Sequence, residues 1–327
     1  MSINFYRRVA NKGAVMVAQV VDWVAIGRNT LTGVTQIMTS LDGITWTNRI
    51  SLLTGSYGSC AAWNGSLWVV GSLGGIATSP DGTTWTNRIS PITFINDIAW
   101  NGSYWIAGGT SINTDGTGAI ATSPDGITWT DRTSLFTWAG SSCRGIAWNG
   151  SYWLALGTGA SKMSTSPDGI TWTSRTSPFD SDGYKAAWGG SLWVAVGNDT
   201  RNYAIATSPD AITWTSRTNP FTSSAYDVAW NGTLFVAVGA NGALIATSPD
   251  GITWTSRTNP LNVIRSVAWN GTLFVAVGRA VSAHNAVATS PDGINWTLRS
   301  TPYPFTGFSS SGIASSNAPN LYPAVTP

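Results

Sequence analysis

The chain has 327 residues, a formal net charge of +2 at neutral pH and only 10% charged residues, against roughly 25% in an average globular protein. This length suits either two ordinary domains or one large all-β domain. Helix formers are scarce, since the sequence has no Glu and only three Lys, and no basic run indicates nucleic acid. With His284 as its only histidine, a Cys/His zinc site is excluded, and we expect no metal and no cofactor.

Two segments recur along the chain. The first reads Ser-Pro-Asp-Gly-Ile-Thr-Trp-Thr, and its Trp stands at positions 46, 85, 129, 172, 214, 254 and 296. The intervals of 39, 44, 43, 42, 40 and 42 residues match the length of a propeller blade of four short strands. The second reads Ala-Trp-Asn-Gly-Ser-Leu-Trp-Val-Ala-Val-Gly, with its leading Trp at 63, 100, 148, 188, 230 and 269. We expect one domain over residues 1–327, with repeats that end near 49, 88, 132, 175, 217, 257 and 299.

Each repeat predicts four strands, which we name a to d. In the sixth repeat they are Asp227–Trp230, Leu234–Val238, Leu244–Thr247 and Ile252–Arg257. Asn231-Gly232 suits a two-residue hairpin turn, because both positions of a type I′ turn need a positive φ. In the turn Ser248–Gly251, Pro fixes φ and Gly relieves the last position.

The termini carry imperfect copies of these strands, in residues 1–9 and 305–327. Ile3–Arg8 is similar to a strand d, Gly312–Ala314 to a strand a, and Leu321–Val325 to a strand b. Pro323 cannot donate to a ladder and should lie at an edge. We therefore predict an all-β propeller with seven complete blades and a partial eighth blade made from the termini. The alternative is a seven-bladed ring with the terminal strands outside it.

The recurring Ser-Pro-Asp-Gly-Ile-Thr-Trp segment resembles the Asp-box of sialidase-like β-propellers, with departures at Leu41, Ala211 and Asn295. The resemblance implies that the box is a structural hairpin on the rim, away from any catalytic centre. Similar Trp-rich propeller repeats occur in bacterial lectins and phage tail proteins.

Alternating strands place the Asn-Gly and Pro-Asp-Gly turns on one face of the disc, the turn face. The b–c and d–a loops share the other, variable face, where binding residues usually lie. The two positions before each inner-strand Ala-Trp core vary between repeats and should meet at the mouth of a central channel. The candidate ligand-binding residues are Asn96, Asp97, Arg144, Tyr184, Lys185, Tyr226, Asp227 and Arg265, together with Trp138 from a variable loop. The alternative is a solvated channel lining with compensating ion pairs.

The other recurring side chains are interpreted as architecture. Eighteen of the 19 Trp occupy repeat positions and should fill the wedges between blades; for Trp138, ligand contact and loop packing both stay open. The Arg that recurs in strand d should pack on a neighbouring Trp or cap loop carbonyls, although such a ring could also hold anionic glycans or a phosphate backbone. Cys60 and Cys143 fall in non-adjacent repeats and should be free thiols.

Enzyme activity is not expected. Sialidase chemistry needs a Glu beside the Tyr nucleophile, no non-repeat Asp pair suggests a glycosidase, and Ser/His/Asp chemistry would depend on His284 alone. No stretch is long and apolar enough for a membrane span. The first 21 residues have no continuous apolar core before a small-residue cleavage site, so we expect no signal peptide.

We expect a non-enzymatic phage tail or virion surface protein that recognises a host glycan. It should bind cell-surface glycan or other virion proteins, without nucleic acid or membrane insertion, as part of an oligomer or larger assembly. The alternatives are a free oligomeric bacterial lectin, in the bacterial cytoplasm or secreted without a recognisable signal, and a purely structural virion component.

Overall fold

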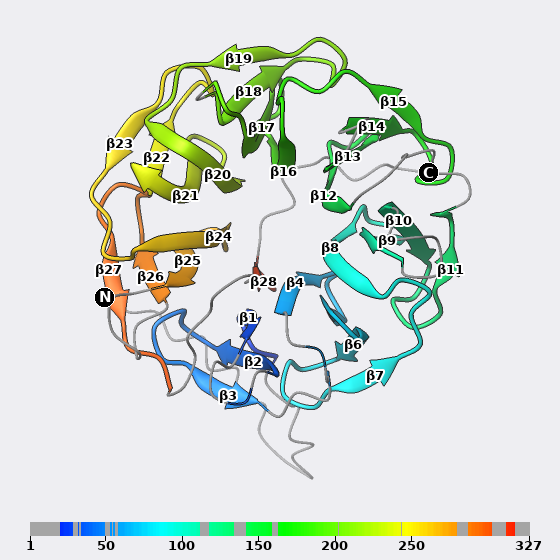
Figure 1. Ribbon diagram of the computed structural model, residues 1–327. Helices are drawn as coiled ribbons and strands as arrows, with labels where there is room; N and C mark the ends of the chain where they lie inside the picture. The colour runs from blue at the N-terminus through cyan, green and yellow to red at the C-terminus, as the bar shows by residue number, and fades with distance from the viewer. Residues whose placement is uncertain are drawn as a thin grey trace.

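The computed structural model describes residues 20–28, 32, 34–49, 53, 55, 58–111, 118–133, 142–158, 163–201, 203–242, 244–279, 287–302 and 312–317. These residues form seven four-stranded antiparallel blades around one axis (Figure 1). Five blades are separate sheets, whereas the fifth and sixth join through a single bridge between Asn198 and Ser224. The predicted β-propeller is confirmed.

Strand a is the innermost strand of each blade. From the first blade to the seventh these strands are β28 (Gly312–Ser315), β4 (Gly58–Trp63), β8 (Phe94–Trp100), β12 (Cys143–Trp148), β16 (Asp182–Trp188), β20 (Phe221–Trp230) and β24 (Val263–Trp269). Strand b follows outward. These strands are β1 (Trp23–Arg28), β5 (Trp68–Ser72), β9 (Trp105–Thr110), β13 (Trp153–Gly157), β17 (Trp193–Asn198), β21 (Phe235–Gly242) and β25 (Phe274–Arg279).

Strand c comes third. These strands are β2 (Thr35–Ser40), β6 (Gly75–Ser79), β10 (Gly118–Ser123), β14 (Met163–Ser166), β18 (Ile205–Ser208), β22 (Ile245–Ser248) and β26 (Val287–Ser290). Strand d forms the outer wall. These strands are β3 (Thr47–Arg49), β7 (Thr86–Arg88), β11 (Thr130–Asp131), β15 (Thr173–Arg175), β19 (Thr215–Arg217), β23 (Thr255–Arg257) and β27 (Thr297–Arg299).

The ring closes inside the first blade. β28, from the C-terminal part of the chain, pairs antiparallel with β1, so that Ile313 lies opposite Ala25 (Figure 1). The predicted use of a C-terminal segment as strand a is therefore correct, but the predicted partial eighth blade is not what β28 builds. The reason is that the first repeat supplies strands b, c and d only, and β28 pairs with the open inner edge of β1. The terminal segments Ile3–Arg8 and Leu321–Val325 lie outside the described residues.

The recurring box folds as a tight turn held by its own Ser and Asp. In the second blade Ser79 Oγ accepts the Gly82 N–H at 2.8 Å, and Asp81 Oδ1 accepts the Thr83 N–H at 2.7 Å. The Trp85 indole then donates to the Gly82 carbonyl at 3.1 Å. Because the carboxylate takes up the N–H groups that follow it, strand d starts at Thr255 in the sixth blade, three residues later than predicted.

The core lies in the wedges between neighbouring blades. The aromatic side chain at the start of strand b is almost fully buried in every blade; these are Trp23, Trp68, Trp105, Trp153, Trp193, Phe235 and Phe274. Each cluster mixes strands of two blades, as where Trp105 of the third blade packs with Val69 of the second. The prediction that the recurring tryptophans are architectural is confirmed for these positions, and Trp138 lies outside the described residues.

Candidate ligand-binding site

Six inner strands contain a β-bulge at the same repeat position. In the third blade Ile95 pairs with Gly109 and Asp97 with Gly108, so Asn96 is the extra, unpaired residue. The bulged residues, which we call the axial ring, are Ser59, Asn96, Arg144, Tyr184, Tyr226 and Arg265. A bulge takes a residue out of the ladder and re-aims its side chain, which is why bulges are common beside functional sites. Each lies four residues before the Trp that ends its inner strand, on the side of that strand toward the variable face.

Four consecutive members of the axial ring form an arc of cations and aromatic rings. The rings of Tyr184 and Tyr226 lie with their centroids 5.4 Å apart at 48°. The Arg265 guanidinium carbon lies 4.1 Å from the centre of the Tyr226 ring, within the range of a cation–π contact. Arg144 at the other end of the arc is exposed. The arc therefore offers two half-buried aromatic rings between two positive charges.

The polar atoms of this arc are incompletely satisfied. The Nε of Arg265 is buried and has no hydrogen-bond partner among the described residues, which is unusual for a buried donor. Burial raises the pKa of Tyr184, and Asp182 adds to this, while Arg144 and Arg265 act in the opposite direction. Tyr184 therefore stays a neutral phenol at physiological pH, able to donate and to accept a hydrogen bond.

The residue after each bulge builds a second, buried layer. Asp97 accepts the Ile146 N–H of the next blade through Oδ2 at 2.7 Å, and Asp227 likewise accepts the Val267 N–H through Oδ2 at 3.0 Å. Lys185 forms an ion pair with Asp97. Burial alone would lower the pKa of Lys185, but Asp97 and Asp227 outweigh it and raise that pKa. Burial raises the pKa of Asp227, and Lys185 opposes this.

The structure thus divides the predicted residues into two sets. Arg144, Tyr184, Tyr226 and Arg265 come together and present side chains in the axial ring. Asp97, Lys185 and Asp227 instead join blades. Asn96 belongs to the axial ring by its bulge, but its side chain also joins blades, since it donates to the Cys143 carbonyl of the next blade at 2.9 Å. The expected alternative of compensating ion pairs therefore describes the buried layer. The bulges were missed, because one extra residue in a strand leaves no mark on the repeat length.

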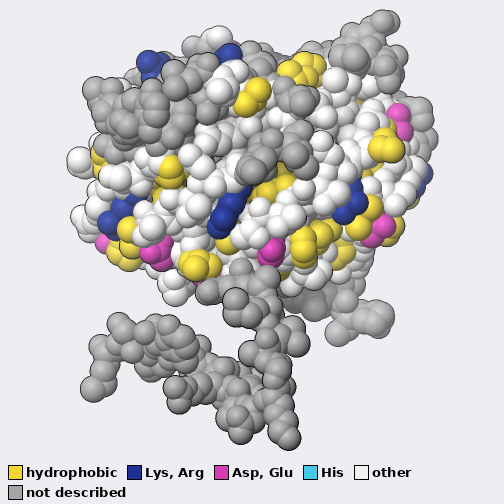
Figure 2. All heavy atoms as spheres, turned by 90° about the horizontal axis from the view of Figure 1, so that it is seen from below, with side chains coloured by type: hydrophobic (Ala, Val, Ile, Leu, Met, Phe, Trp, Pro, Cys, Tyr) yellow, Lys and Arg dark blue, Asp and Glu magenta, His cyan; other side chains and the backbone are white. Residues whose placement is uncertain are grey.

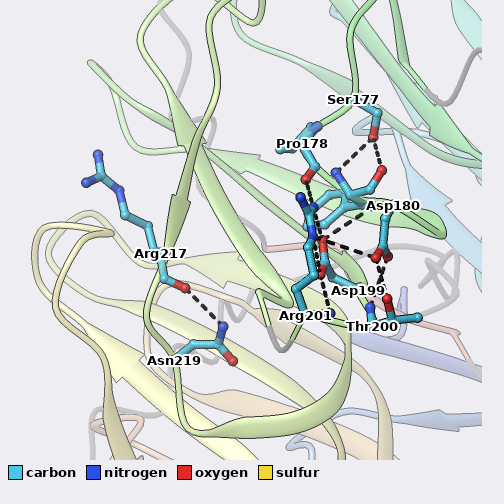
Figure 3. Close-up of polar contacts among 9 residues, drawn as sticks. Ser177, Pro178, Asp180, Asp199, Thr200, Arg201, Arg217 and Asn219 are labelled. Carbon is cyan, nitrogen blue, oxygen red and sulfur yellow. Dashed lines mark hydrogen bonds and ion pairs between the residues drawn. The ribbon is translucent and has the colours of Figure 1, made fainter.

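A second charged cluster lies on the variable face of the fifth blade (Figure 3). Arg201 donates through Nη2 to the Pro178 carbonyl at 2.9 Å and through Nε to Asp199 Oδ1 at 3.0 Å. Asp180 accepts the Thr200 N–H at 2.9 Å. These contacts tie the b–c loop of the blade to the loop before β16, and the charges compensate one another. We assign the cluster to loop support.

The recurring strand-d arginines also have a structural role, with a different partner from the one predicted. In every blade the Arg Nε donates to the hydroxyl of a Thr on strand c, at 2.8 Å for Arg88 and Thr78. Figure 2 shows the outer wall of the disc, where Lys and Arg side chains lie at mid-height and at the upper edge, and most acidic side chains lie toward the lower edge of the view.

Within the described ranges, no group of three or more His, Cys, Asp or Glu side chains could hold a metal ion. Burial raises the pKa of both free thiols, Cys60 and Cys143. No helix in the described part of the chain is long and apolar enough to cross a membrane.

Comparison with known proteins shows the fold. The chain is similar to the structure described as "YCF48 bound to D1 peptide", with a TM-score of 0.58 and 18% identity over 79% of this chain and 88% of that one. It is also similar to "Nidogen/Laminin Complex", with a TM-score of 0.52 and 10% identity over 90% of this chain and 99% of that one. The computationally designed Ika8 protein is similar as well, with a TM-score of 0.51 and 11% identity over 81% of this chain and 80% of that one. No protein-family model and no curated protein matches the sequence. The protein is a seven-bladed β-propeller, and these comparisons do not confirm the resemblance to Asp-box and phage tail proteins.

Proposed function

We propose that the protein is a non-enzymatic binding propeller that recognises a glycan on a cell surface through the axial ring. The observation that carries the proposal is the bulge in six inner strands at a repeat position where polar side chains differ from blade to blade. A rigid scaffold that brings varied side chains to one place is typical of binding sites. The turn face, in contrast, repeats the same residues in nearly every blade.

The arc suits a sugar because it combines aromatic faces with hydrogen-bonding groups. The rings of Tyr184 and Tyr226 can pack against the C–H face of a pyranose, and the phenols and guanidinium groups can bind its hydroxyls. The two positive charges favour a glycan that also carries negative charge. A non-enzymatic role is supported by the absence of Glu from the sequence and by the engagement of Asp97 and Asp227 in bonds between blades.

The setting that we propose is a phage tail or another virion surface, with the protein as part of an oligomer or larger assembly. It is supported by the resemblance of the repeats to Trp-rich propellers of phage tails. A free oligomeric lectin would use the same site. A polypeptide is the second candidate ligand, because two of the propellers similar to this chain are described in complex with a peptide or with a protein.

A glycan array tests the proposal. We expect the purified protein to bind a subset of glycans, and the double variant Tyr184→Ala/Tyr226→Ala to lose at least about tenfold in affinity, since two aromatic contacts of about 1 kcal/mol each are removed. Tyr203→Ala is the matched control, because Tyr203 is 40% exposed and lies in a b–c loop. An array without signal for the wild type would contradict glycan recognition. Binding from a displayed peptide library that the double variant loses would then identify a polypeptide ligand.

A further inference from the structure

The outer wall has a pocket of about 440 Å³ between the sixth and seventh blades, a size within the range of small-molecule sites. One side is formed by residues 256–260, at the end of β23 and in the loop that follows. The other side is formed by residues 294–297, from the box of the seventh blade to the start of β27. The pocket is therefore separate from the axial ring, which lies on the innermost strands.

An aromatic side chain lines this pocket. The Trp296 indole donates to the Gly293 carbonyl at 3.0 Å, so its polar atom is already satisfied and the indole itself is half-buried in the pocket wall. An aromatic ring held in this way gives an apolar contact of fixed orientation. The same bond holds Trp254 in the sixth blade, at 2.9 Å.

Three polar side chains beside Trp296 keep unused hydrogen-bonding atoms. Arg257 donates through Nε to Thr247 at 2.8 Å, and its two terminal nitrogens have no partner among the described residues. Asn259 accepts the Leu261 N–H at 3.2 Å, which leaves its Nδ2 donor without a partner in the described structure. Asn295 donates to Asp292 at 2.8 Å, and its Oδ1 acceptor has no partner within the described ranges. The pocket therefore offers both donors and an acceptor around an aromatic ring.

The equivalent wedge between the fifth and sixth blades lacks this combination. There Asn219 donates to the Arg217 carbonyl at 3.1 Å (Figure 3), so its amide is engaged, and Thr253 stands in the place of Asn295. The two wedges share the Arg and the Trp but differ in their amide groups. The difference gives a control within one chain.

We propose that this pocket is a carbohydrate subsite for a neutral pyranose, independent of the axial ring. Sugar hydroxyls both donate and accept hydrogen bonds, which matches Arg257, Asn259 and Asn295, and the C–H face of the ring packs on Trp296. A second site on the same rigid body would let one chain bind a branched or dense glycan surface at two points, which raises avidity without new contacts at the axial ring.

The test uses residues that the protein itself carries at the same repeat positions. The double variant Asn259→Ser/Asn295→Thr introduces the Ser of position 177 and the Thr of position 253, so folding should be preserved, with a thermal midpoint within about 2 °C of the wild type. Asn219→Ser is the control in the neighbouring wedge. The probes are the methyl glycosides of glucose, galactose, mannose and N-acetylglucosamine, titrated by saturation-transfer NMR. We expect at least one to bind with a dissociation constant of about 1 mM, about tenfold more weakly to the double variant, and unchanged to the control.

The inference is overturned if no methyl glycoside binds, or if binding is unchanged in Asn259→Ser/Asn295→Thr. The two sites are distinguished by the axial-ring variant Tyr184→Ala/Tyr226→Ala. Loss of glycoside binding in that variant alone would remove the outer subsite and leave the proposed function intact. Loss in Asn259→Ser/Asn295→Thr alone would support the outer subsite whatever the axial ring binds.

Discussion

Lys185 on β16 forms an ion pair with Asp97 on β8, two blades away. The fourth blade lies between them, and its Gly145 packs against the backbone of Tyr184 and Lys185. A Cβ on Gly145 would lie 2.2 Å from the carbonyl oxygen of Tyr184 and 3.2 Å from Cα of Lys185. A glycine is therefore required where the strand carrying Lys185 passes, and the lysine connects the third, fourth and fifth blades beneath the axial ring.

We predict that Lys185→Met destabilises the protein by about 3 kcal/mol, because it leaves Asp97 and Asp227 as buried carboxylates without their cation. Burial already raises the pKa of Asp227 and Lys185 opposes this, so in the variant that pKa rises further in the folded state. The loss of stability is therefore largest at neutral pH and shrinks as the pH falls through the raised value. Chemical denaturation of the wild type and the variant at pH 7 and pH 5 measures both effects. An equal loss at the two pH values would contradict the ion-pair account.

The Trp153 indole donates to the Tyr104 hydroxyl of the preceding blade at 2.7 Å. We predict that Tyr104→Phe costs about 1–3 kcal/mol, because a buried donor is left without a partner. The Trp105 indole has no hydrogen-bond partner in the part of the chain that the structure describes. In the blade that precedes it, Leu67 stands at the repeat position of Tyr104. Leu67→Tyr should therefore stabilise the protein by about 1 kcal/mol. Urea denaturation measures both, and stabilisation by Leu67→Tyr in the background Trp105→Phe would argue against the bond.

Ala211 is the only non-glycine residue with positive φ in the described structure, at 58°, and it replaces the glycine of the box in the fifth blade. In the same box, the buried indole nitrogen of Trp214 has no hydrogen-bond partner within the described structure. We predict that Ala211→Gly stabilises the protein by about 1 kcal/mol, because the left-handed conformation costs a Cβ-bearing residue about that much. Gly251→Ala, at φ +73°, should destabilise it. Thermal denaturation of the two variants gives opposite shifts of the midpoint if the strain is real.

The lowered pKa values of the box aspartates allow a prediction of how the free energy of unfolding changes with pH. Burial alone would raise the pKa of Asp81, but hydrogen bonds from Thr83, Thr84 and Ser79 outweigh it and lower that pKa from 3.8 to about 2. Since the folded-state value is the lower one, the contribution to stability is fully present above pH 4 and is lost as the pH falls toward 2. Unfolding free energies measured between pH 6 and pH 2 should be flat and then decline. Asp81→Asn should make the decline in unfolding free energy smaller. The pH at which the decline begins should not change, because the aspartates of the other boxes still contribute.

Local chemistry made most of the fold predictable. The Ser248–Gly251 box determines a turn within four residues, and the positions of the Trp residues give the blade length. The two-residue type I′ turn predicted at Asn231-Gly232 is wrong, because Gly232 has φ +99° but Asn231 does not have a positive φ. Asn231 Oδ1 instead accepts the N–H groups of Thr233 and Leu234, so a loop of four residues joins Trp230 to Phe235. The start of strand d could not be placed, because the Asp250 carboxylate takes up the N–H groups of Ile252 and Thr253, which the sequence pattern alone assigns to the strand. The incomplete first repeat, which supplies only three strands, was counted as a complete blade.

The candidate site was predictable in position but only partly in chemistry. Variation at Tyr184, Tyr226 and Arg265 within a nearly uniform repeat pointed to the right place. The role of Asp97 depends on Ile146 and Lys185, which lie 49 and 88 residues further along the chain, and no local pattern reports contacts across three blades. One residue did indicate a close contact between blades. Gly145 stands at the repeat position that holds Asp97 and Lys185 in the neighbouring blades, and a side chain there would collide with the backbone of Tyr184.

The central claim, that the axial ring positions a ligand, is tested most directly by a structure of the protein with the strongest ligand from the glycan array or the peptide library. The account predicts density for the ligand on the variable face, within contact distance of the Tyr226 ring and the Arg265 guanidinium. Density confined to the turn face, or to the outer wall with the axial ring empty, would contradict it.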